Sequence, residues 1–71
     1  MKIFIKEKNI EAKFSLQHSD EAEKDIRNML IVLSDLNSKY SNELNKHIFK
    51  VLYFEYGLEK LTLHGHEVFN G

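Results

Sequence analysis

Two stretches at the start of the chain alternate apolar and polar residues. Residues 2 to 7 do so through Ile3 and Ile5, and residues 10 to 17 follow the same pattern. The apolar positions of the second stretch are Ile10, Ala12, Phe14 and Leu16. A period of two is typical of a strand with one face against a core. Lys8-Asn9 separates the stretches, and Asn tolerates the positive φ that a tight turn requires, so the pattern predicts an N-terminal β-hairpin.

The period changes after His18. Ser19 or Asp20 can cap a helix, with Glu23 placed as in a capping box. Apolar residues then recur every four and three positions, the spacing of a coiled-coil seam: Ala22, Ile26, Met29, Leu33, Leu36 and Tyr40. Leu30 and Val32 widen this stripe. Ile31 lies about 180° from the centre of the stripe, so a helix with one buried face would leave it in water. We expect the seam to pack on a second helix, which makes helix against helix the main core, or on its own copy in a dimer.

Residues 37 to 42 are polar and predict a break, with Ser41 as the cap of a second helix. This helix is expected to end at Tyr56, because Gly57 before the apolar Leu58 matches a glycine-terminated stop. Its apolar positions form one stripe of Leu44, Ile48, Val51 and Leu52 and a second stripe of Phe49, Tyr53 and Tyr56. One sheet face cannot cover both helices all round, so we expect some of this surface to meet another chain.

The tail from residue 58 onward returns to strand character. Gly65 is compatible with the first position of a two-residue turn, which would create a fourth strand, or with an interruption of one edge strand. The element order β-β-α-α-β, with or without a fourth strand, predicts an α+β fold. We expect residues 1–71 to form a single domain in which a small antiparallel sheet packs on a two-helix hairpin.

Composition excludes several classes of protein. The 71 residues include no Cys, which excludes a disulfide scaffold and a zinc finger. The longest apolar run, Met29 to Leu33, is far too short to cross a membrane, and charges near the start argue against an export signal, so we expect a cytoplasmic protein. A net charge of −1 and a single arginine, Arg27, disfavour sequence-specific DNA binding.

Two groups of residues resemble chemical sites. On a continuous strand His64 and His66 would project from one face and could share a divalent ion if His18 or Glu67 supplied a third ligand. Two solvated histidines beside a turn glycine are the simpler interpretation, and we expect no metal.

Glu43, His47 and Lys50 have the i, i+4, i+7 spacing of one helix face, where a carboxylate could orient an imidazole for acid–base chemistry. Such spacing is more typical of a surface pair. The chain also lacks a glycine-rich phosphate loop and a serine in a glycine-flanked turn. We therefore expect no catalytic residues, no cofactor and no enzyme activity.

The aromatic residues of the second helix suggest a binding function. Aromatic side chains are enriched in interface cores, although Phe49 and Tyr53 are equally suited to a core layer on Phe4, Phe14 and Phe69. We expect a small protein that binds another protein and inhibits or regulates it stoichiometrically. The expected contacts are Phe49, Tyr53, Phe54 and Tyr56 as anchors, Ile31 as an outlying contact, and Lys46 and Lys50 as the polar rim.

The origin of the chain and a second function are also suggested by composition. Many Lys, Asn, Ile and Phe with little Arg or Pro are typical of an AT-rich genome, and a short chain without catalytic motifs is typical of phage or mobile-element proteins that inhibit host or defence enzymes. The alternative is a homodimeric nucleic-acid-associated regulator. It would contact phosphate through the hairpin lysines Lys2, Lys6, Lys8 and Lys13.

Overall fold

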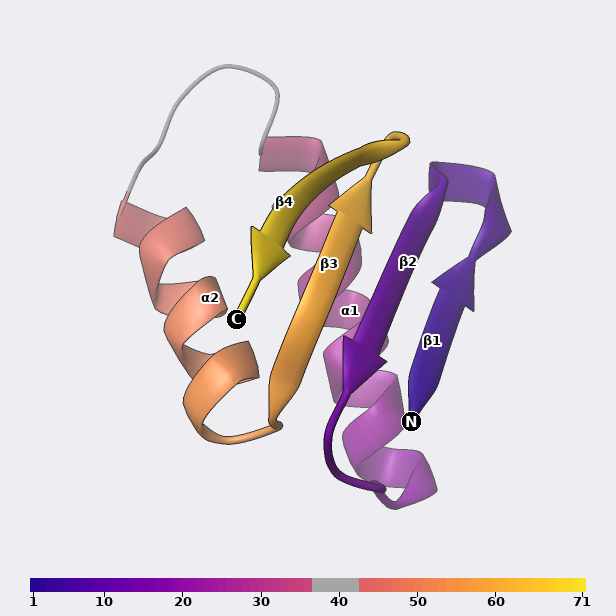
Figure 1. Cartoon of the computed structure of the whole chain (residues 1–71), viewed down its shortest axis with the longest axis vertical. Coiled ribbons are helices and arrows are strands. Elements are labelled where there is room, and N and C mark those ends of the chain that lie inside the picture. The colour runs from indigo at the N-terminus through magenta and orange to yellow at the C-terminus, as the bar shows by residue number, and fades with distance from the viewer. Residues whose placement is uncertain (37–42) are drawn as a thin grey trace.

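The computed structural model describes residues 1–36 and 43–71. They form a four-stranded antiparallel sheet of order β1-β2-β3-β4, with both helices inserted between β2 and β3 (Figure 1). The elements in chain order are β1 (Lys2–Ile5), the 3-10 turn η1 (Lys6–Lys8), β2 (Ile10–Phe14), α1 (Asp20–Leu36), α2 (Glu43–Phe54), β3 (Leu58–Leu63) and β4 (His66–Asn70). The predicted α+β class is confirmed, and the fourth strand is present.

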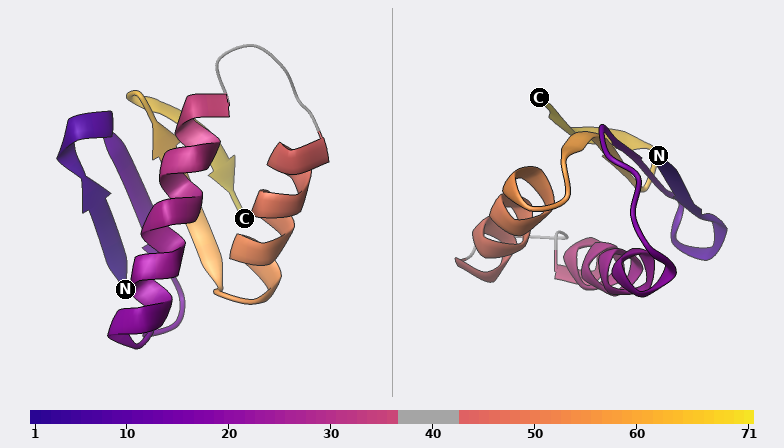
Figure 2. Two further views of the ribbon diagram at one scale, coloured as in Figure 1. Left: turned by 180° about the vertical axis from the view of Figure 1, so that it is seen from behind. Right: turned by 90° about the horizontal axis from the view of Figure 1, so that it is seen from below.

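The helices leave one face of the sheet open. α1 crosses behind the strands, and α2 lies beside α1 and packs along β3 (Figures 1 and 2). The face of the sheet that is turned toward the viewer in Figure 1 therefore carries no helix. Neither helix in the described ranges is long and apolar enough to cross a membrane.

The core lies between the sheet and the helices. Among the described residues the strands supply eight buried apolar side chains, namely Ile3, Ile5, Ile10, Ala12, Phe14, Leu58, Leu61 and Leu63. The helices supply five, namely Ile26, Leu30, Leu33, Ile48 and Leu52. The expectation that helix against helix is the main core is therefore wrong. A four-stranded sheet offers each helix more apolar area than a single neighbouring helix does.

The N-terminal hairpin has the predicted inward-facing residues but shorter strands. η1 replaces the last residues expected in β1, and Asn9 adopts the left-handed conformation with φ 52°, donating its N–H to Lys6 O at 3.2 Å. Leu16 was expected on the buried side but is 51% exposed. β2 ends at Phe14, after which Ser15 N–H donates to Gly57 O at 2.8 Å and the chain turns toward α1.

α1 begins at a serine cap. Ser19 Oγ accepts the N–H of Ala22 at 3.2 Å, so Ser19 caps the helix and Asp20 is its first residue. The buried face is Ile26, Leu30, Leu33 and Ser34. Ile26 and Leu33 belong to the expected seam, and Leu30 to its expected widening. The centre of the buried face is nevertheless turned toward Leu30 because α1 packs on the sheet, and Val32, also expected on the stripe, is 41% exposed. As a result Ile31 lies at the margin of the buried face and is partly buried against the core, which corrects the expectation that it stands in water.

α2 ends at Phe54, two residues earlier than predicted. Gly57 has a φ of 77° and its N–H donates to Tyr53 O at 3.2 Å, so glycine terminates the helix as expected. Leu44 was assigned to a buried stripe, yet it is 49% exposed. The expected break at 37–42, including the Tyr40 end of the seam and the Ser41 cap, lies outside the described residues.

The tail is a hairpin. Leu63 pairs with His66, and the two residues between them, His64 and Gly65, have φ values of 52° and 80°. Positive φ at both central positions defines a type I′ turn, which suits the twist of the flanking strands. Gly65 therefore occupies the second position of the turn, not the first.

Candidate functional site

Aromatic rings connect the core to the surface beside the end of α2. Phe49 stacks on Phe69 of β4 at 6.1 Å between ring centroids, and Tyr53 meets the same Phe69 edge-on at 5.6 Å. Tyr53 in turn contacts Phe54 edge-on at 4.8 Å. We call Phe49, Phe69, Tyr53 and Phe54 the ring ladder. Along it exposure rises from partly buried Phe49 and Phe69 to Tyr53 at 45% and Phe54 at 76%.

A surface hollow of about 470 Å³ adjoins the exposed end of the ring ladder. Its lining is Ser15, Tyr53, Phe54, Gly57, Leu58, Glu59 and Gly71. The hollow is shallow and open to solvent, a shape into which a side chain of a partner protein can dock. Exposed Leu16 adds apolar surface nearby, since a Cβ built on Gly57 would lie 3.1 Å from Leu16 Cγ.

Hydrogen bonds fix the floor of this hollow. The Ser15 N–H and Ser15 Oγ both donate to Gly57 O, at 2.8 and 3.2 Å, and join the end of β2 to the turn after α2. The Gly71 N–H donates to Glu59 O at 2.9 Å across the opposite wall. A surface held in this way loses little conformational entropy on binding, which favours affinity.

Tyr56 lies apart from the exposed rings. Its ring meets His18 edge-on at 5.3 Å and packs against the core, and His18 Nε2 donates to Tyr56 O at 2.7 Å. His18 thus joins the segment before α1 to the end of α2. Tyr56 and Phe49 support the fold, while Tyr53 and Phe54 are the expected anchors that reach solvent.

The remaining expected contacts are distributed over both helices. Lys46 and Lys50 are exposed on α2, and Lys50 precedes Phe54 by one helical turn. Lys46 pairs with Glu43 at 3.9 Å, so the partner of Glu43 is this lysine and not His47 as the catalytic hypothesis required. Ile31 is on α1 and outside the hollow lining.

Some residues beside the hollow were not expected there. Phe69 was correctly matched with Phe49 and Tyr53, but Phe4 was wrongly assigned to the same layer: it lies on the open sheet face and is 56% exposed. Ser15 and Gly71 join the site only through the tertiary fold, and no local pattern identifies them.

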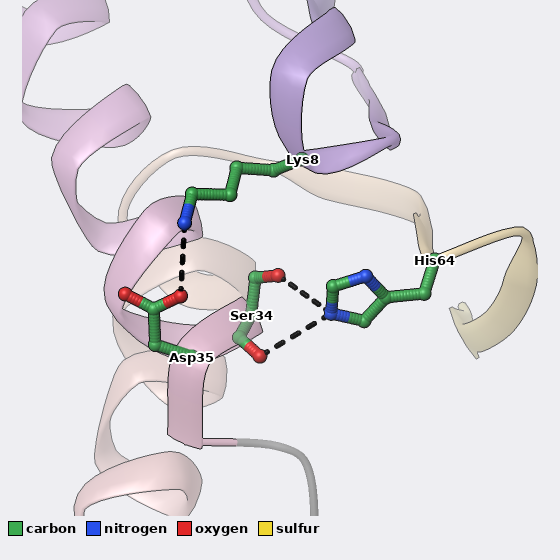
Figure 3. Close-up of polar contacts among 4 residues, drawn as sticks. All are labelled: Lys8, Ser34, Asp35 and His64. Atoms are coloured by element: carbon green, nitrogen blue, oxygen red, sulfur yellow. Dashed lines mark hydrogen bonds and ion pairs between the residues drawn. The ribbon is translucent and has the colours of Figure 1, made fainter.

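A third group of polar contacts closes the end of the sheet against α1 (Figure 3). His64 Nε2 lies 2.9 Å from Ser34 Oγ and 3.4 Å from Ser34 O, while Lys8 Nζ pairs with Asp35 at 3.3 Å. A serine beside an imidazole resembles an activated nucleophile. However, the Ser34 side chain is buried, so its hydroxyl lies out of reach of a substrate, and we interpret the contact as structural.

The turn between β3 and β4 determines whether His64 and His66 can share a metal ion. His64 is directed at α1, and the turn separates it from His66, so the two imidazoles do not share one face of a continuous strand as that hypothesis required. Within residues 1–36 and 43–71 no three potential ligands of the His, Cys, Asp or Glu type gather closely enough to hold an ion.

The four hairpin lysines are divided by the fold. Lys8 is directed to Asp35 on α1, whereas Lys2 and Lys13 are paired in register across β1 and β2 on the open face. They do not form a single cluster of four.

Comparisons with known proteins give no indication of the function of this chain. The chain matches no protein family, and no curated protein or solved structure shows detectable similarity to it.

Proposed function

We propose that this chain is a small non-catalytic protein that binds another protein through the exposed end of the ring ladder and inhibits or regulates it stoichiometrically. The observation that carries the proposal is Phe54, a phenylalanine with three quarters of its surface in water, braced by Tyr53 and set beside a hollow with a fixed floor. Aromatic residues, phenylalanine among them, are enriched in the buried cores of protein interfaces.

The energetics require more than these two rings. Burying Phe54 against a partner would contribute about 2 kcal/mol, whereas association costs at least about 4 kcal/mol in lost freedom of motion. A stable complex of standard size buries about 800 Å² on each partner. The surface must therefore extend from Phe54 and Tyr53 over the hollow and along the outer side of α2.

The charges on α2 indicate the chemistry of the partner. Lys50 lies one turn from Phe54, and Lys46 lies one turn further, each exposed. A partner surface with an apolar socket for Phe54 and acidic residues around the socket complements this arrangement. Occupying such a surface needs no chemical step, which suits a stoichiometric inhibitor, and an inhibitor encoded by a phage or mobile element is the form that we propose.

Two matched substitutions test the proposal. The full chain, wild type or with Phe54→Ser or Phe4→Ser, is immobilised and exposed to host lysate, and a retained protein is then purified and titrated with each variant. Phe4 is the control because it is a similarly exposed phenylalanine on the open sheet face.

We expect Phe54→Ser to weaken binding at least about 30-fold, the loss typical of an anchor residue, and Phe4→Ser to leave affinity within about twofold. Equal retention by all three chains would refute the proposed surface. Sedimentation of the pure protein tests whether a second copy of this chain covers the surface instead. A dimer that Phe54→Ser abolishes would assign the surface to self-association.

A further inference from the structure

Three lysines form a row across the open face of the sheet. In the strand register Lys2 of β1 is opposite Lys13 of β2, and Lys13 is opposite Lys60 of β3. Directly opposed side chains on one face lie about 5 Å apart at Cβ. The neighbours Ile3, Ala12 and Leu61 are buried against the helices, so by the alternation of each strand the row lies on the opposite face, and all three lysines are exposed.

This alignment is unfavourable in the isolated protein. Like charges placed directly opposite each other destabilise a sheet. Carboxylates relieve the repulsion only in part: Lys13 pairs with Glu59 at 3.7 Å and Lys60 pairs with Glu67 at 3.5 Å, all with half-exposed side chains. Such exposed pairs are worth at most about 1 kcal/mol each, so an anion bound to the row can displace them.

The row borders a hollow of about 250 Å³. Its lining is Lys2, Glu11, Lys13, Lys60 and Thr62. The three ammonium groups and the Thr62 hydroxyl are donors suited to a phosphate group, while the carboxylate of Glu11 can only accept. A ligand that fits this lining therefore carries both a phosphate and a hydroxyl that donates.

An aromatic ring stands next to that carboxylate. Phe4 is opposite Glu11 in the register, on the same face as Lys2 and two residues from it. Residues two apart on a strand are separated by about 6.6 Å. The face thus presents the lysine row and, beside it, a second row of Phe4, Glu11, Thr62 and Glu67 with the ring of Phe4 at one end.

We propose that the open sheet face binds a nucleotide. The lysine row and Thr62 hold the phosphate, Glu11 accepts a hydrogen bond from a sugar hydroxyl, and the exposed ring of Phe4 stacks on the base. Stacking of bases on aromatic side chains and contacts of cationic groups to phosphate are the two interactions by which proteins bind single-stranded nucleic acid without reading its sequence. The ligand is a free mononucleotide or one residue of a single strand, and the same chemistry serves both.

This site is independent of the proposed protein-binding surface. Phe4, Lys2 and Lys60 are not part of the hollow lined by Tyr53 and Phe54. Lys13 is less suitable for testing because its partner Glu59 also lines that hollow. The variants below therefore avoid Lys13, and failure of one proposal leaves the other standing.

The test is a calorimetric titration of the full chain at low salt with four probes: adenosine monophosphate, ribose 5-phosphate, inorganic phosphate and a twelve-residue oligouridylate, whose 2′-hydroxyls can donate to Glu11. The variants are Phe4→Ser, Lys60→Gln and Lys2→Gln, with Lys24→Gln on the exposed side of α1 as the matched loss of one positive charge. Thermal unfolding of each variant checks that the fold is retained.

We expect adenosine monophosphate to bind more tightly than ribose 5-phosphate, and Phe4→Ser to weaken it at least about fivefold through the lost stacking. Lys60→Gln and Lys2→Gln should weaken all four probes by at least about threefold, and Lys24→Gln should not. Tighter binding of the oligonucleotide, with the same dependence on Phe4 and Lys60, supports a single-stranded source. Tighter binding of the mononucleotide supports a free ligand.

Three results would overturn the proposal. They are the absence of binding at millimolar probe, equal affinity for adenosine monophosphate and inorganic phosphate, and equal losses from Lys24→Gln and Lys60→Gln. The second would show that the base contributes nothing, and the third that only net charge matters.

Discussion

Replacing Gly57 by alanine should destabilise the protein at the floor of the proposed binding hollow. The φ of Gly57 is 77°, in the left-handed region that costs a residue with a side chain about 1–2 kcal/mol. A Cβ at this position would also lie 2.5 Å from Ser15 Oγ and 3.1 Å from Leu16 Cγ. The Ser15 side chain must move, and its hydrogen bond to Gly57 O is lost.

The turn at Gly65 separates the backbone cost of positive φ from the cost of displacing the Ser15 side chain. Gly65 has nearly the same φ, 80°, but a Cβ there would meet only Asn9 Nδ2, at an ordinary 3.5 Å. Gly65→Ala therefore carries the backbone cost alone. Gly57→Ala adds the lost hydrogen bond, worth about 1 kcal/mol, and an altered rotamer, worth about 0.5–1.5 kcal/mol.

The assay is thermal and urea unfolding of the three chains followed by circular dichroism. Together the lost hydrogen bond and the altered rotamer cost about 1.5–2.5 kcal/mol, which corresponds to a melting temperature lower by roughly 6–20 °C in a domain of this size, so Gly57→Ala should melt that far below Gly65→Ala. Equal melting temperatures would refute the reasoning, because they would mean that Ser15 and Leu16 do not pack against the turn and that the hollow has no fixed floor.

Further substitutions test the cap, the orientation of the helices and the exposure of the anchor. Ser19→Ala removes the acceptor for the Ala22 N–H and should cost about 1 kcal/mol in urea unfolding; no change would mean that another residue caps α1. Leu30→Ala should cost about 2–5 kcal/mol and Leu44→Ala less than about 1 kcal/mol, and the reverse order would restore the seam expected from the sequence. Phe54→Ser should cost about 1 kcal/mol or less, the value of one ring contact, and a larger loss would place Phe54 in the core.

Local rules predicted the strands and turns well. Ile10, Ala12 and Phe14 alternate with polar residues and lie on the buried face of the sheet as expected. Asn9 and Gly57 both adopt positive φ, also as expected. These features depend on side-chain period and backbone sterics, which act between near neighbours in the chain.

Tertiary packing explains the main errors. Ile26, Leu30 and Leu33 of the expected stripe are buried, as their spacing predicts. Packing on the sheet turns the centre of the buried face toward Leu30 and Ser34, however, so Ile31 becomes partly buried. Leu44 fits a helical stripe, yet it stays exposed, since burial on α2 centres on Asn45, Ile48 and Leu52. A one-dimensional pattern does not specify which neighbour a helix packs against.

The candidate sites were predictable only in part. Tyr53 and Phe54 follow from counting apolar faces on the second helix, whereas the hollow beside them depends on Ser15 and Gly71 arriving from distant strands. The lysine row needs Lys60, which joins Lys2 and Lys13 through the register of β3 on β2. Lys13 and Lys60 are 47 residues apart in the chain, so no local sequence rule predicts the strand register that places them opposite each other.

Phe54 is open to solvent in the isolated chain, and we propose that a partner protein covers it. The most direct measurement places the photoreactive residue p-benzoylphenylalanine at position 54 or, as the control, at position 4, and irradiates host cells that produce each chain. We expect one adduct of defined mass with a single protein from position 54 and none of that mass from position 4. No adduct from position 54, or the same adducts from both positions, would show that no partner protein is specifically bound at Phe54.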